Sequence, residues 1–183
     1  MHNNLLCVAV AYAGLPAATA AQTEVTTVGK WEVVRFVDPI TDARIITLKL
    51  PSEEGTQPDG QPFILTINCL LDVSAGGPSN VSIEWGGDNM LPNVTTRFGH
   101  EKPGTTRWSV RAVFTFSRSS SEFITRLLHY DRFVARAERN LGPPTSTNLL
   151  LRRTLTGIWD TTGFDEALAD DLEICGLAAK PIG

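Results

Sequence analysis

The sequence predicts an α+β protein, in which an antiparallel, β-rich sheet or sandwich carries two short packed helices. From residue 30 onward, short runs rich in β-branched and aromatic residues alternate with clusters of Gly, Pro, Asn and Asp, as in antiparallel strands and their turns. Two segments, 119–131 and 161–175, instead repeat their apolar residues at helical spacing. The 183 residues suffice for one domain with a real core and are too few for two.

The expected strands have apolar residues at every second position, so that one face of each is buried. In the run VSIEW, for example, Val81, Ile83 and Trp85 share a face. The expected strands cover residues 30–37, 44–50, 62–71, 81–85, 94–99, 107–117, 132–138 and 149–159. Loops are expected from Pro51 to the start of the third strand and over residues 86–93.

Both helical segments begin with capping signals. Ser119 and Glu122 have the spacing of a capping box, so Ser119 should cap the first helix, and Leu127 should be buried on its apolar stripe. In the second segment Thr161 or Thr162 could be the cap, and two acidic residues follow in the first turn.

The start of the chain has the pattern of a secretory signal peptide. The apolar run LLCVAVAYAGL is followed by small residues of the Ala-x-Ala kind at 18–20, although a basic start is missing and only His2 is present. A disordered or core-packed N-terminus is the alternative. We therefore expect a signal peptide at 1–21, a single domain at 22–183, and a periplasmic or secreted protein. No later segment approaches about 18 consecutive apolar residues, so no transmembrane segment is expected in the mature chain.

Charge and motifs argue against several function classes. The net charge of −4 gives no basic surplus, so nucleic acid is not an expected partner. The sequence contains no nucleophile elbow, phosphate loop or zinc-binding motif, so we expect no catalytic residue, no cofactor and no metal. His100 and His129 lack neighbouring ligands, and a structural role is expected for each.

Two carboxylates, Asp38 and Asp42, lie in the loop DPITD between two expected strands. Pro39 fixes the φ angle that a type I turn requires, and Asp38 can accept hydrogen bonds from the backbone ahead of it, so the loop is interpreted as a turn. The alternative is the acid pair of a glycosidase, which would need a cleft and a raised pKa on one member.

The four tryptophans fall on strand patterns, which favours core packing. A possible binding loop is nevertheless formed by Trp85, Asp88 and Asn89, because an aromatic residue at a loop tip can contact a sugar or a peptide.

Five blocks of the sequence, in order, resemble a known family. They run from Trp31 to Cys175. The first block is WEVV, DPITDAR and ITLKL, the second is PFILTINC, and the third is RFG and WSV. The fourth is FITRLLHYDRFVARA, and the fifth is TTGFDEALADDLEIC. Similar blocks occur in the VasI-like proteins, a family associated with type VI secretion, and the fourth block is the most specific. The DPITD turn and the segment 140–159 depart from the family pattern.

The resemblance implies a small exported accessory protein, mostly β, with no defined reaction and no catalytic residue to carry over. We therefore expect protein–protein interaction with a bacterial envelope or secretion-system protein. The alternatives are an envelope enzyme acting on glycan or peptidoglycan, and a small ligand-binding module. An enzyme should hold Asp38, Asp42 or Glu84 in a cleft, whereas an adaptor should show an exposed apolar patch or an open sheet edge.

A disulfide between Cys69 and Cys175 is expected. Removal of the signal peptide would remove Cys7, and the two remaining cysteines continue the apolar faces of a strand and a helix that could pack together. An exported protein would keep such a bond in its oxidising surroundings. The alternative is a pair of buried free thiols, which behave as small hydrophobic residues.

Overall fold

The predicted fold class is confirmed, since the chain forms mostly antiparallel β-structure with two short helices. The computed structural model describes residues 23–71, 80–87, 89–141 and 152–177. The expected signal peptide at 1–21 lies outside the described residues. The elements in chain order are β1 (Thr23–Val28), β2 (Trp31–Val37), β3 (Arg44–Thr56), β4 (Pro62–Leu71), β5 (Asn80–Glu84), β6 (Met90–Phe98), β7 (Gly104–Arg107), β8 (Ser109–Arg111), β9 (Phe114–Phe116), α1 (Ser120–Leu127), β10 (Arg132–Asn140), β11 (Arg152–Asp160) and α2 (Phe164–Leu168).

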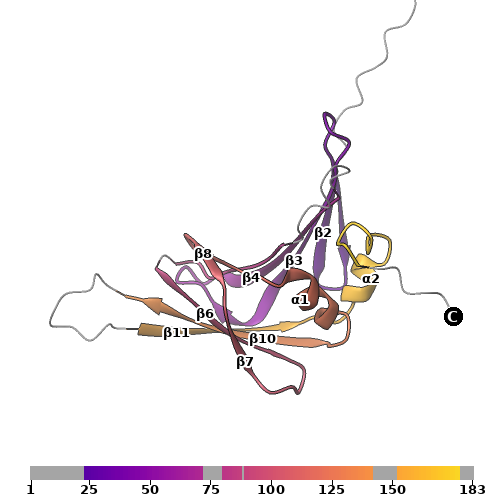
Figure 1. Cartoon of the computed structure of the whole chain (residues 1–183). Coiled ribbons are helices and arrows are strands. Elements are labelled where there is room, and N and C mark those ends of the chain that lie inside the picture. The colour runs from indigo at the N-terminus through magenta and orange to yellow at the C-terminus, as the bar shows by residue number, and fades with distance from the viewer. Residues whose placement is uncertain (1–22, 72–79, 88, 142–151, 178–183) are drawn as a thin grey trace, which may run out of the picture.

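The strands form one sheet that curls into a nearly closed barrel-like wall (Figure 1). Its order is β7-β6-β10-β11-β3-β4-β5-β9-β8, and β2 and then β1 are added beside β3. The long strand β3 joins the two halves. Its first part pairs with β2 and β4, while Glu54 near its end pairs with Ile158 of β11. We call β7, β6, β10 and β11 the second half-sheet.

The two ends of the sheet come together at β6 and β8. The backbone N–H of Trp108, which lies between β7 and β8, donates a 2.7 Å hydrogen bond to the carbonyl of Pro92 in β6. The Trp108 side chain is buried, and its indole N–H donates to Thr106 Oγ1 at 3.0 Å. This residue therefore helps to close the wall.

A chain of buried aromatic rings fills the inside of the wall. Neighbouring ring centroids are 6.3, 5.3, 5.0 and 4.9 Å apart along the series Trp85, Trp159, Phe133, Phe98 and Phe123. The indole N–H of Trp85 donates to Thr115 Oγ1 at 3.0 Å, and that of Trp159 donates to the Leu50 carbonyl at 3.1 Å. Such rings supply much of the buried apolar area, and these indole groups have the polar partners that burial requires.

The strands differ from the sequence prediction at four places. β1 was not expected, and β3 continues to Thr56 where a loop was predicted from Pro51. The polar stretch of β3 is extended because Ser52 bridges it to β4: its hydroxyl donates to the Gly55 carbonyl and accepts the Phe63 N–H. The loop expected at 86–93 is shorter, because β6 already begins at Met90.

The single strand expected at 107–117 is instead divided among β7, β8 and β9. β8 and β9 form a hairpin in which Arg111 pairs with Phe114, and Ala112 at its turn has a positive φ of 48°. In this stretch the apolar residues alternate without interruption, and no glycine or asparagine marks the turn, so the sequence alone does not indicate it.

Both helix caps also differ from expectation. Ser119 is the N-cap of α1, but its side chain makes no cap hydrogen bond, so the capping box does not form. α2 is capped by Gly163 rather than by a threonine and covers five residues of the longer segment that was predicted. The burial of Leu127, at 2% exposure, agrees with the prediction.

Candidate functional site

The two carboxylates of the DPITD loop shape a turn. Asp38 Oδ1 accepts hydrogen bonds from the N–H of Ile40 at 2.8 Å and of Thr41 at 3.3 Å, and the Asp38 carbonyl accepts the Asp42 N–H at 2.9 Å. The hydrogen bond from the Ile40 N–H lowers the pKa of Asp38, which is the opposite of what a general acid needs. Asp42 is exposed with a positive φ of 56°, a conformation that aspartate tolerates in turns.

Glu84 does not join these carboxylates. It ends β5, whereas Asp38 and Asp42 lie at the tip between β2 and β3. Three surface hollows of the described chain are lined by other residues. Asp38 and Asp42 therefore share an exposed turn, while Glu84 lies on another element, and none of the three lines one of these hollows.

The residues of the possible binding loop lie in different surroundings. Trp85 is fully buried and contacts Phe63 and Trp159, so its ring does not face solvent. Asn89 is exposed, with a positive φ of 64°. Asp88 lies outside the described residues.

The two histidines occupy exposed positions. His100 is in the turn after β6, and Nδ1 of His129 lies 2.7 Å from the Thr125 carbonyl just after α1. Among the described residues, no group of three or more His, Cys, Asp or Glu side chains is placed to hold a metal ion.

The disulfide between Cys69 and Cys175 is present, as predicted. It joins β4 to the segment after α2, with Cα atoms 4.7 Å apart, and the two cysteines are 106 positions apart in the sequence. Both cysteines are buried. The bond therefore fastens the C-terminal segment to the middle of the sheet.

Strands β1, β2 and β3 form an arm whose outer end rises away from the rest of the sheet (Figure 1). β1 pairs only with β2 among the described strands, so its outer edge is open. Exposed apolar side chains occur on the same arm: Val25 is 61% exposed, Val37 39% and Ile40 90%. An open edge beside exposed apolar residues is the arrangement that docks other chains or that a protein must protect from them.

Contacts with α2 and with the segment after it hold the arm to the rest of the molecule. Trp31 of β2 packs on Phe164 of α2 with ring centroids 4.9 Å apart. Arg35 Nε donates a 2.8 Å hydrogen bond to Asp171 Oδ2, and Asp171 is 2% exposed. Beside this pair lies a hollow of about 200 Å³ that is also lined by Glu24 and Arg44. The strand β2, which pairs with the open edge, is therefore anchored to α2 and to the segment after it.

The sequence predicted β2, the first part of β3 and the turn between them, but not β1. The run TEVTTV is rich in β-branched residues, and this signal could have identified β1. The exposure of Ile40, at 90%, is known only from the structure.

Comparison with family models, with curated proteins and with solved structures finds no significant match. The described part of the chain contains no helix that is both long and apolar enough to span a membrane.

Proposed function

We propose that this protein is an exported accessory of the bacterial envelope that acts by binding another protein, as the type VI secretion-associated family that it resembles is expected to do. The resemblance rests on the ordered sequence blocks between Trp31 and Cys175. An envelope or secretion-system protein is the partner that this resemblance implies.

The arm is the observation that carries the binding function. Its open β1 edge offers backbone groups to an extended segment of another chain, and Val25 and Ile40 offer apolar contacts beside it. Because Arg35 of the arm is paired with Asp171 of the segment after α2, binding at the edge costs little ordering of the arm itself. The exposed turn position of Asp38 and Asp42, outside the lining of the three hollows, and the lowered pKa of Asp38 favour binding over an acid-pair enzyme.

The disulfide supports export. A buried bond between Cys69 and Cys175 suits a protein that folds in an oxidising compartment, because reducing systems keep cytosolic thiols free. The apolar run at 5–15 and the small residues after it supply a route to that compartment.

Export is tested by expressing the full chain with a C-terminal tag in a bacterium. The protein should be released by osmotic shock, and its N-terminus should begin near residue 22. A chain that stays in the cytoplasm with its first 21 residues intact would remove the export part of the proposal.

Binding is tested by cross-linking and affinity capture from envelope extract with three forms of the protein. The variant Val25→Asp/Ile40→Asp should lose a saturable partner that the unchanged protein captures, because charges replace the apolar contacts of the arm. Leu141→Asp is the matched control, since Leu141 is 52% exposed but lies beyond the end of β10. If no captured protein depends on the arm, the arm is not the binding surface.

A further inference from the structure

Positive charge gathers on the second half-sheet although the whole chain carries a net charge of −4. Its four strands contain seven arginines, no lysine and two carboxylates. The arginines are Arg97, Arg107, Arg132, Arg136, Arg139, Arg152 and Arg153. The net charge of the whole chain therefore does not reveal the excess of positive charge on these strands.

Both carboxylates of these strands already have cationic partners. Glu138 accepts a 3.1 Å hydrogen bond from Arg152, and Asp160 accepts a 2.7 Å hydrogen bond from Lys30. Neither carboxylate therefore neutralises the positive charge of the arginines at the centre of the half-sheet.

The centre is formed by Arg97 of β6 and Arg136 of β10. Arg97 pairs with Val134 and Arg136 with Thr95, so the two arginines occupy diagonal positions on neighbouring strands. Both are exposed, and neither has an ion pair or a side-chain hydrogen bond within the described part of the chain. Like charges at diagonal positions of a sheet repel each other, and bound negative charge would reduce this repulsion.

A hollow of about 220 Å³ lies at the same place. Its lining includes both arginines, Thr95, Thr156 and Val134. Arginine presents planar, paired donors that match a carboxylate, and threonine hydroxyls can donate beside them. The hollow therefore has the donors that a carboxylate-bearing side chain needs.

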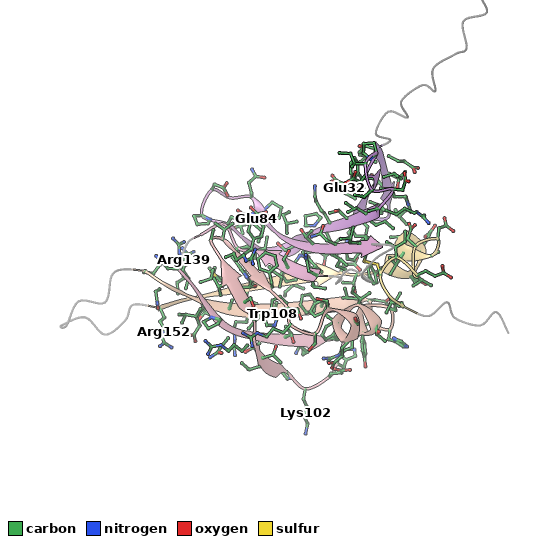
Figure 2. The ribbon with its side chains drawn as sticks, turned by 45° about the horizontal axis from the view of Figure 1, so that its top comes forward. Glu32, Glu84, Lys102, Trp108, Arg139 and Arg152 are labelled. Carbon is green, nitrogen blue, oxygen red and sulfur yellow. A yellow bond between two sulfur atoms is a disulfide. The ribbon has the colours of Figure 1, made fainter. Side chains whose placement is uncertain are left out.

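Figure 2 labels several charged residues of the described chain. Lys102, in the turn between β6 and β7, and Arg152 of β11 appear on the lower side of the ribbon, while Glu32 and Glu84 appear on the upper side. Arg139 of β10 lies between Glu84 and Arg152 in this view.

We infer that the outward face of β6 and β10 docks an acidic segment of a partner protein, with Arg97 and Arg136 binding its carboxylates. This inference rests on the proposed function for the class of partner, a protein, but it concerns a surface separate from the arm. Arginine enrichment with depletion of lysine is typical of protein interfaces. The exposed large apolar residues, which a membrane surface would bind, lie on the arm or beyond the end of β10.

The test measures binding of a fluorescent poly-glutamate peptide to the mature protein by anisotropy at low salt. The variant Arg97→Glu/Arg136→Glu should bind at least tenfold more weakly, and Arg97→Gln/Arg136→Gln should show an intermediate loss. Arg111→Glu/Arg118→Glu is the matched control, because both arginines are exposed, have no ion pair among the described residues and change the net charge equally. Its affinity should stay within about twofold of the unchanged protein, and added salt should weaken binding. Circular dichroism checks that each variant is folded.

Three results would overturn the inference. The first is equal loss in the control and in the Arg97 and Arg136 variants, which would mean unspecific attraction to net charge. The second is no peptide binding by the unchanged protein at low salt. The third is binding to phosphatidylglycerol vesicles without binding to the peptide, which would indicate a membrane surface instead. Envelope capture that depends on the arm but not on these arginines would leave the proposed function standing and this inference rejected.

Discussion

Arg35 and Asp171 lie 136 positions apart in the chain, yet Arg35 Nε donates a 2.8 Å hydrogen bond to the Asp171 carboxylate. The side chain of Asp171 is 2% exposed and that of Arg35 is 26% exposed. Arg44 approaches the same carboxylate at 3.5 Å. One buried charge thus connects the segment after α2 to two strands of the arm.

Replacing Asp171 should destabilise the protein. Asp171→Ala leaves Arg35 without its partner, and we expect a loss of about 2–3 kcal/mol, below the range for a fully buried pair because Arg35 retains contact with solvent. Urea unfolding measures the loss. Arg44→Ala is the control and should cost less than about 1 kcal/mol, because Arg44 is largely exposed and its contact is long. Equal losses in the two variants would contradict this assignment.

The disulfide should contribute more than any single ion pair. For a closed loop of about a hundred residues, the chain-entropy model gives up to about 4–5 kcal/mol, and we expect about 2–5 kcal/mol to be lost in Cys69→Ala/Cys175→Ala. Reductant should lower the urea midpoint of the unchanged protein in the same direction. Alkylation without reductant should label neither cysteine in mass spectrometry, and labelling of both would show that the bond is absent.

The two ends of α1 should respond differently to mutation. Leu127→Ala empties a buried site and should cost about 2–5 kcal/mol. Ser119→Ala should change the free energy of unfolding by less than about 0.5 kcal/mol, because the Ser119 side chain makes no cap hydrogen bond. A loss near 1 kcal/mol at Ser119 would indicate that the cap forms in solution.

Strands with one buried face were predictable from sequence. In β4, and in β10 from Phe133 to Ala137, every second side chain is buried, so the alternation of apolar residues predicts the pattern of burial. The disulfide was predictable for the same reason, since Cys69 continues the buried face of β4. By contrast, β1 has mostly exposed residues on both faces and gives no alternation.

The candidate surfaces were less predictable because they depend on distant pairings. The open edge of β1 is known only when the strand order is known. Similarly, Arg97 and Arg136 become neighbours through the register of β6 and β10, and neither stands in a basic run of the sequence. Charge patterning along a chain cannot show which residues a sheet brings together.

Stability should depend on pH through Asp160. Its hydrogen bonds, first from Lys30 and then from Thr162, lower the pKa of the carboxyl from 3.8 to about 2. The ionised form is thus favoured by folding, so this stabilisation is present above about pH 4 and is lost as the pH falls toward about 2. The difference in unfolding free energy between the unchanged protein and Asp160→Asn should shrink over this interval.

An NMR titration of the Asp160 carboxyl carbon provides the direct measurement. Lys30→Gln should move its midpoint upward, because the strongest hydrogen bond to the carboxylate is removed. A midpoint near the usual value in the unchanged protein would contradict the interaction with Lys30.

The junction between the two halves of the sheet requires glycine at position 55. Gly55 has a φ of +91°, and a Cβ atom there would lie 2.2 Å from the Thr156 carbonyl oxygen and 2.7 Å from the Phe63 ring. Gly55→Ala therefore combines backbone strain with a collision between β3 and β11, and we expect a loss of about 3 kcal/mol or more. Gly60→Ala separates these causes, since Gly60 has a similar φ of +85° but nothing within 4 Å of the added atom. It should cost only about 1 kcal/mol from the backbone conformation. Urea unfolding compares the two variants. Equal losses of unfolding free energy would mean that β3 and β11 move apart to accommodate the added methyl group.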